Sequence, residues 1–335
     1  MRPPLLTIED LRVTALSNGK RVRVVDGLSL TVAAGETVGL VGESGCGKSV
    51  TALSVLDLLP RPPLEIEAGR IRFDDLDLRR LRDDSLRRVR GGDIAMIFQE
   101  PMTALNPVLT IGRQLSESLV THLGLSPRTA RLRAAVWLRR VNMAAPERQL
   151  SAYPHELSGG MRQRVMIAMA MACRPRLLIA DEPTTALDAT IQAQILTLMN
   201  RLKSRLGSAL LLITHDLGVV AQMASRVVVM YAGQVVESAA VGPLFKSPFH
   251  PYTEALLAAV PRWGGGAAGT RLSAIRGTVP APGERITGCR FAPRCSFAFT
   301  RCREASPPLF EVAVGQHARC WLHLHPEKRK GGRYG

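Results

Sequence analysis

Gly42-Glu43-Ser44-Gly45-Cys46-Gly47-Lys48-Ser49 follows the pattern G-x-x-x-x-G-K-[ST]. In this pattern the glycines let successive backbone N–H groups turn inward around a chain of phosphates. The apolar run 36–41 before the pattern is typical of a short buried strand, and the run 50–56 after it is typical of a helix. The N-terminus of that helix adds the positive end of its dipole to the same place. These residues therefore predict a phosphate-binding loop between a strand and a helix.

Three further apolar runs, at 94–99, 177–182 and 209–216, lack polar alternation and end in polar residues. Such runs are typical of parallel strands that are covered on both faces of a sheet. Parallel sheets bind ligands at the carboxyl ends of their strands. We therefore expect an α/β fold that gathers the following residues near the phosphate loop: Gln99, Asp181, Glu182 and His215.

Other segments complete this plan. Alternating apolar positions over 5–32, with a turn at Asn18-Gly19, predict an antiparallel start. The arginine-rich pattern over 111–141, broken at Ser126-Pro127, predicts a helical insertion. Ser158 is a natural N-cap, and Gly159 and Gly160 behind it would expose the first N–H groups of a helix as a second anion-binding helix end.

Composition limits the class of protein. No apolar run approaches the roughly 20 residues that span a membrane, and the segment 1–7 lacks the hydrophobic core of a signal peptide. We therefore expect a cytoplasmic chain whose membrane work goes through a partner. A net charge of +16 suggests an anionic neighbour, either nucleic acid or a membrane surface, or solvated arginines with no such role. Aromatic residues make up only 4%, which disfavours a nucleic-acid surface built on base stacking.

The amino-acid composition of the chain changes after residue 248. Residues 263–266 resemble a linker, and the proline- and glycine-rich sequence beyond them carries Cys289, Cys295, Cys302 and Cys320. Four thiolates suit zinc or an iron–sulfur cluster. The spacing lacks the close cysteine pairs of structural zinc sites, but spare histidines keep zinc open, namely His317, His323 and His325. Four buried or free thiols are the third possibility.

Residues 1 to about 245 resemble the ATP-binding subunits of ABC transporters, through six motifs in the family's order. The loop 42–49 matches Walker A, Gln99 the Q-loop, and Leu157-Ser158-Gly159-Gly160 the signature. The run 177–182 matches Walker B, Asp188 the D-loop, and His215 the switch histidine. The resemblance implies a P-loop cassette over 1–248, with its helical insertion at about 102–172, and a C-terminal extension over 249–335.

Catalytic roles follow from the resemblance and from the needs of phosphoryl transfer. Lys48 would neutralise charge on the γ-phosphate, and Glu182 would act on the attacking water as general base or as the group that positions it, with Gln99 and His215 beside them. Mg²⁺ would be held by Ser49, Gln99 and Asp181. The residues expected to bind ATP are Gly42, Ser44, Gly45, Gly47, Lys48, Ser49, Val50, Ser158, Gly159, Gly160 and Asp188. The signature residues would close over ATP held by a second cassette.

One departure from the family pattern concerns the base of ATP. The family usually places an aromatic residue in the first strand to stack on adenine. Here that stretch runs from Leu11 to Ala15, and no aromatic residue precedes Phe73. Stacking by this chain is therefore in doubt. The family accepts either serine or cysteine at the position of Cys46, so no catalytic role is expected for this cysteine.

The stretches 102–107 and 250–253, with the cysteine-bearing tail, resemble the di-/oligopeptide importers. In that branch two different ATPase subunits pair beneath two transmembrane permease subunits, fed by an extracytoplasmic substrate-binding protein. The branch implies a 4Fe-4S cluster on the four tail cysteines, and a peripheral place on the cytoplasmic face of the cell (inner) membrane. An importer of nickel, opines or another small solute is an alternative. A soluble ABC ATPase acting on ribosomes or DNA is disfavoured, because this chain has one cassette and no long insertion before Ser158.

Overall fold

A computed structural model of the protein describes residues 4–17, 19–99, 104–259, 275–281, 284 and 286–331. Asn18, residues 102 and 103 of the importer motif and the linker-like residues 263–266 lie outside these ranges. The chain divides into two compact units, and each is described by itself. Unit 1 comprises residues 1–6, 31–37 and 72–213, and unit 2 comprises residues 7–30, 38–71 and 214–335.

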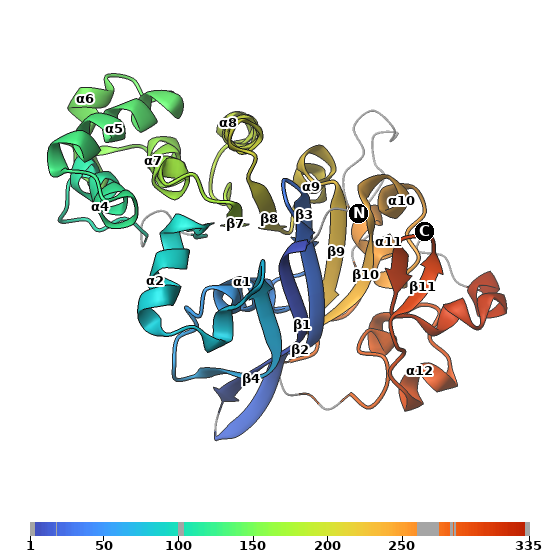
Figure 1. Ribbon diagram of the computed structural model, residues 1–335. Helices are drawn as coiled ribbons and strands as arrows, with labels where there is room; N and C mark the ends of the chain where they lie inside the picture. The colour runs from blue at the N-terminus through green and yellow to red at the C-terminus, as the bar shows by residue number, and fades with distance from the viewer. Residues whose placement is uncertain are drawn as a thin grey trace. The chain divides into compact units, whose positions relative to one another are not determined.

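Unit 1 carries three parallel strands and the predicted helical insertion (Figure 1). Its elements are β5 (Leu76–Asp77), α2 (Asp83–Gly92), β6 (Ile94–Ile97), α4 (Ile111–Leu123), α5 (Pro127–Arg140), α6 (Pro146–Gln149), α7 (Gly159–Ala172), β7 (Leu177–Asp181), α8 (Ala189–Leu206) and β8 (Ala209–Thr214).

The parallel strands β6, β7 and β8 pair in that order. Ile94 is opposite Leu177, and Leu177 is opposite Ala209. Every residue of β7 and β8 is buried, which explains why their sequences are continuously apolar. The chain leaves β7 directly at Glu182, so the sheet places this carboxylate at its carboxyl edge, as the sequence predicts.

The insertion is a helical cluster in which α4, α5 and α7 pack on one another. Helix α5 begins where Ser126 accepts the backbone N–H of Thr129, so the predicted break at Ser126-Pro127 is the start of a capped helix. Figure 1 shows α4, α5, α6 and α7 grouped together in the green part of the chain.

Unit 2 carries the long N-terminal strands, the phosphate loop and the C-terminal extension. Its elements are β1 (Pro4–Ser17), β2 (Lys20–Ala33), β3 (Thr37–Val41), α1 (Lys48–Val55), β4 (Leu64–Phe73), α9 (Leu217–Met223), β9 (Arg226–Tyr231), β10 (Gln234–Ala240), α10 (Val241–Lys246), α11 (Pro251–Ala258), α12 (Thr300–Glu304), β11 (Phe310–Ala313) and β12 (Gln316–Ala318), with some strand ends assigned to unit 1. Strands β2, β1 and β4 are neighbours in one sheet, as expected of the alternating N-terminal sequence.

The C-terminal extension continues a sheet rather than forming a separate layer. Strand β3 pairs parallel with β9, β9 pairs antiparallel with β10, and β10 pairs antiparallel with β12. Glu237 of β10, which is fully buried, fastens this junction through its carboxylate. It accepts the backbone N–H groups of Phe249 and His250 at 2.7 and 2.9 Å and the side-chain amide of Gln316 at 2.9 Å. A buried carboxylate with three donors is a satisfied charge, so it holds the extension without a large desolvation cost.

Within the described part of the chain, no helix combines the length and the apolar character that crossing a bilayer requires.

Candidate nucleotide site

The loop between β3 and α1 has the backbone of a phosphate cradle. Gly42, Gly45 and Gly47 all have positive φ. A Cβ atom at Gly47 would lie 2.8 Å from the carbonyl oxygen of Val24, a distance that side chains do not tolerate. The loop therefore needs glycine for steric reasons within unit 2 itself.

Lys48 lies in the centre of this loop, and its side chain is buried. Its Nζ atom donates to the carbonyl oxygens of Gly42 at 2.8 Å and of Glu43 at 3.1 Å. Ser49 and Val50 follow it in the first turn of α1 and are half-buried. A buried lysine in the first turn of a helix suits a polyanionic ligand such as a chain of phosphates.

The loop is supported by residues that the sequence did not single out for this purpose. The backbone N–H of Glu43 donates to the Tyr252 hydroxyl at 2.9 Å. The Glu43 carboxylate accepts both terminal nitrogens of Arg294 at 2.7 and 3.0 Å. The Arg294 side chain is only 4% exposed, and Glu43 raises its pKa further, so this guanidinium stays charged. A buried bidentate pair of this kind fixes the position of Glu43 in the loop.

A second group of expected site residues comes together in unit 1. Gln99 Nε2 donates to Glu182 Oε2 at 3.4 Å, and Thr185 Oγ1 donates to the same oxygen at 2.9 Å. Glu182 has a φ of +46° and its backbone N–H donates to Ile213 at 2.9 Å. A left-handed φ is strained for a residue with a Cβ atom and is typical of functional positions. Asp181, the residue before it, is buried at the end of β7.

The oxygen atoms of Ser49, Gln99 and Asp181 are the type of ligand that Mg²⁺ prefers. Ser49 belongs to unit 2, while Gln99 and Asp181 belong to unit 1. By ligand type, the side-chain oxygens of each residue therefore fit Mg²⁺. His215, at the start of the last part of unit 2, is exposed beyond β8.

The signature residues begin α7. Ser158 accepts the backbone N–H of Met161 at 3.4 Å as the N-cap, which confirms the predicted cap. A Cβ atom at Gly160 would lie 2.9 Å from a methyl group of Ile191, so glycine is needed where α7 packs on α8. A Cβ atom at Gly159 would meet only Leu187, at 3.8 Å. Asp188 is the N-cap of α8 and accepts the backbone N–H of Ile191 at 2.9 Å.

The four extension cysteines lie in one region of unit 2. The backbone N–H of Cys289 donates to the carbonyl oxygen of Cys302 at 2.7 Å. Burial, and then the charges of Cys289 and Cys302, raises the pKa of Cys295 to about 12. Burial likewise raises the pKa of Cys320, with smaller contributions from the other three cysteines. Among the described residues, however, no group of three or more cysteine, histidine or acidic side chains is arranged to hold a metal ion. The expected zinc or iron–sulfur site therefore gains no support from the structure.

Together, a glycine-lined phosphate loop with a central lysine, and a strand-end carboxylate bonded to a glutamine, define a nucleotide-hydrolysing cassette. Comparison with known proteins gives the same class. The ABC transporter family model matches residues 25–185. The model of the oligopeptide/dipeptide transporter C-terminal region matches residues 236–302.

Close relatives span nearly the whole chain. "Probable peptide ABC transporter ATP-binding protein y4tR" of Sinorhizobium fredii is 52% identical over 95% of this chain and 94% of its own. "Oligopeptide transport ATP-binding protein AppD" of Bacillus subtilis is 49% identical over 95% of this chain and 97% of its own. The chain thus belongs to the family of ABC transporter ATP-binding proteins.

Solved structures support the fold. A dimeric ATP-binding cassette in a post-hydrolysis state with ADP and Pi aligns with a TM-score of 0.63 at 27% identity. That alignment covers 70% of this chain and 98% of the other chain. The cbiO1 cassette of Clostridium perfringens aligns with a TM-score of 0.61 at 26% identity, over 73% of this chain and 91% of its own.

Proposed function

We propose that this protein is the ATP-hydrolysing subunit that powers an ABC importer of di- or oligopeptides. The observation that carries the proposal is the phosphate loop with Lys48 buried at its centre. Peptide as cargo is supported by the names of the two relatives and by the match to the oligopeptide/dipeptide transporter C-terminal region. An importer of nickel, opines or another small solute is the alternative, since other subunits select the cargo.

In hydrolysis, Lys48 holds the charge of the terminal phosphates, and Glu182 orients and deprotonates the attacking water. Gln99 and Thr185 support this role because both donate to the same Glu182 oxygen, which limits how far the carboxylate can turn. Ser49, Gln99 and Asp181 would hold Mg²⁺, which would neutralise charge on the phosphates. His215 contacts the γ-phosphate from the end of β8.

A second cassette completes the site. Ser158 and Gly159 are exposed at the N-terminus of α7, and a Cβ atom at Gly159 would meet only one side-chain atom. Glycine at this position is therefore explained better by close approach of an external group than by packing within the chain. The external group is ATP held by a partner cassette, which is a different subunit in a heterodimer. Asp188 lies at the same interface.

The complex includes two transmembrane permease subunits and an extracytoplasmic substrate-binding protein. The protein is then peripheral on the cytoplasmic face of the cell (inner) membrane, and its excess of basic charge suits an anionic membrane surface rather than a nucleic-acid partner.

The four cysteines of the extension remain a candidate 4Fe-4S site. Two observations support this: the cysteines share one region, and, in addition to burial, the charges of Cys289, Cys295 and Cys302 raise the pKa of neighbouring thiols. Metal analysis after anaerobic purification tests it. We expect about four iron and four sulfide per chain, and their loss in the variant with all four cysteines changed to serine. Stoichiometric zinc instead, or no metal, would contradict the cluster.

The function is tested by reconstituting the protein with its permease and binding subunits in liposomes. We expect ATP-dependent peptide uptake, and its loss in a complex with Lys48→Ala. Lys203→Ala is the matched control. It removes a lysine outside the loop, whose Nζ atom donates to Thr37 Oγ1 at 2.6 Å. ATP hydrolysis stimulated by nickel or an opine but not by peptides would assign the alternative cargo.

A further inference from the structure

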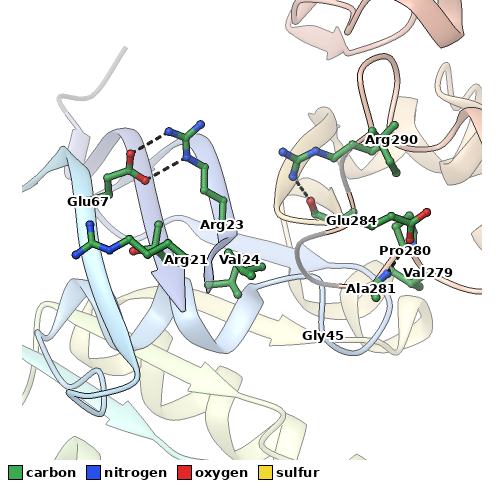
Figure 2. Close-up of a pocket in the computed structure, with 14 residues that line it drawn as sticks. Arg21, Arg23, Val24, Gly45, Glu67, Val279, Pro280, Ala281, Glu284 and Arg290 are labelled. Atoms are coloured by element: carbon green, nitrogen blue, oxygen red, sulfur yellow. Dashed lines mark hydrogen bonds and ion pairs between the residues drawn. The ribbon is translucent and has the colours of Figure 1, made fainter. Parts of the chain in front are cut away.

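Unit 2 contains a cavity of about 480 Å³ that opens beside the phosphate loop. One side of the cavity is lined by Gly45 of the loop and by Val22 and Val24 of β2. The other side is lined by residues of the C-terminal extension, namely Val279, Pro280 and Ile286. Figure 2 shows Val24, Arg23 and Glu67 on one side and Val279, Pro280 and Ala281 on the other. The volume falls within the range of small-molecule sites, roughly 300 to 1,000 Å³.

Backbone contacts place the lining of the cavity directly beside the phosphate loop. The carbonyl group of Val24 approaches Gly47 so closely that a Cβ atom there would lie 2.8 Å from it. The backbone N–H of Gly233, beside the lining residue Ala232, donates to the carbonyl oxygen of Cys46 at 3.0 Å. The cavity therefore borders the loop at Gly45, where a ligand with its phosphates in the loop could extend into it.

Two arginines hold the extension against this region. Arg290 forms an ion pair with Asp26 and donates to the carbonyl oxygen of Ala232, and it lines the cavity itself. Arg294 forms the buried bidentate pair with Glu43 of the phosphate loop. Val279 also packs on the apolar core that contains Tyr231, Tyr252 and Phe291. The extension side of the cavity is thus anchored both to the loop and to the core of unit 2.

The lining has the chemistry of a nucleoside site. Branched aliphatic side chains and Pro280 offer apolar surface, while Thr14, Glu284 and the Arg23–Glu67 ion pair supply polar groups at its margin. Among the described residues that line the cavity there is no aromatic side chain, and the sequence has none before Phe73. Apolar contact on a flat ring therefore has to come from aliphatic residues here.

We propose that this cavity receives the adenine and ribose of ATP, and that Val279, Pro280 and Ile286 form the apolar wall that a first-strand aromatic residue would otherwise supply. The C-terminal extension is then part of the nucleotide site. This inference rests on the proposed ATPase function.

The test compares ADP with pyrophosphate, because both occupy the phosphate loop but only ADP carries the nucleoside. Affinities are measured by isothermal titration calorimetry with Mg²⁺ on the full chain carrying both Val279→Ala and Ile286→Ala. We expect roughly tenfold weaker binding of ADP, from the lost apolar contact, and unchanged binding of pyrophosphate. Ile275→Ala is the matched control, because Ile275 also packs on the core from the extension but does not line the cavity.

Unchanged ADP affinity in the double variant would overturn the proposal. Equal losses for ADP and pyrophosphate would also overturn it, because they would indicate that the extension acts only on the shape of the loop. Failure of the ATPase assignment itself would look different: neither ligand would bind the unaltered protein, or Lys48→Ala would leave both affinities unchanged.

Discussion

Gln99 Nε2 lies 3.4 Å from Glu182 Oε2, and the two residues are separated by 83 positions in the sequence. The parallel pairing of β6 with β7 produces this relationship, because Gln99 follows the end of one strand and Glu182 follows the other. Thr185 donates to the same oxygen. Two neutral donors therefore orient this carboxylate oxygen, which suits a group that has to accept a proton from water.

Glu182→Gln is expected to lower ATP hydrolysis at least about 100-fold while ATP stays bound. Glutamine has nearly the same shape, so it occupies the same left-handed backbone at similar cost, and only the basic group is lost. Steady-state phosphate release measures the first effect, and retention of labelled ATP by the purified complex measures the second.

Thr185→Val is the companion variant, since it removes one donor to Glu182 and leaves the carboxylate in place. We expect Thr185→Val to lower the rate of hydrolysis much less than Glu182→Gln does. If Glu182→Gln turned over ATP at the normal rate, another group would have to be the base.

Cys46 is expected to react slowly with N-ethylmaleimide, and only while the loop is free of nucleotide. Its thiol is buried, and burial raises its pKa despite the opposing charge of Lys48, so little thiolate is present at neutral pH. The rate of modification should therefore increase as the pH rises toward the raised pKa. Peptide mapping by mass spectrometry resolves this cysteine from the other five.

Modification should abolish ATP binding, because the adduct would fill the loop, and Mg-ATP should protect against it. Cys46→Ser should keep ATPase activity and resist inactivation. Rapid modification of Cys46 in the presence of saturating Mg-ATP would show that the nucleotide does not occupy this loop.

The cassette could be predicted in detail because its signals are local. The glycines and Lys48 of the loop, the uninterrupted apolar strands before Gln99 and Asp181, and the Ser158 cap each depend on neighbours within a few residues. Backbone propensity and burial alone are enough to place them. The order of these motifs along the chain then indicates the family to which the chain belongs.

The role of the extension could not be predicted, because it depends on pairs that are distant in sequence. Glu43 and Arg294 are 251 residues apart, and neither stands in a pattern that points to the other. No sequence pattern predicts the pairing of β10 with β12 or the three donors to Glu237 either. A composition rich in proline and glycine suggested a separate region, whereas the structure adds this region to the sheet and to the loop.

The Glu43–Arg294 pair predicts an asymmetric cost of mutation. Glu43→Ala leaves a buried guanidinium without its partner, which typically costs about 3 to 5 kcal/mol. Arg294→Met leaves Glu43, whose side chain is 27% exposed, able to reach water. We therefore expect the first variant to be less stable than the second in urea unfolding, and the double variant to be more stable than Glu43→Ala alone.

Arg23 and Glu67 provide the matched control. They form an ion pair joined by two hydrogen bonds, at 2.9 and 3.1 Å, but their side chains are more exposed. Glu67→Ala should have a much smaller effect on stability. Equal costs for the Glu43 and Glu67 variants would mean that burial does not strengthen the pair in the loop.

His250 predicts how acid destabilises the junction between β10 and the extension. It is fully buried, and its Nδ1 atom accepts the backbone N–H of Tyr252 at 3.0 Å. The backbone N–H of His250 donates to Glu237 Oε2 at 2.9 Å. Burial lowers the pKa of His250 to about 3, with smaller effects from Arg319 and Arg329. The unfolded chain takes up a proton near pH 6.5, while the folded chain does so only near pH 3. The stabilisation is therefore fully present above pH 6.5 and is lost as the pH falls toward 3.

His250→Asn keeps a side-chain acceptor at this N-cap but removes the titrating ring. The unfolding free energy of the unaltered protein minus that of the variant should fall by about 1.6 kcal/mol between pH 6.5 and pH 5, because the unfolded ring goes from half to nearly fully protonated over that interval. Urea unfolding of both proteins at pH 8, 6.5 and 5 measures the difference, with pH 8 as the reference at which the ring is neutral in both states. A difference that stays constant with pH would show that the folded protein protonates His250 as readily as the unfolded chain, and that the ring is open to water at this junction.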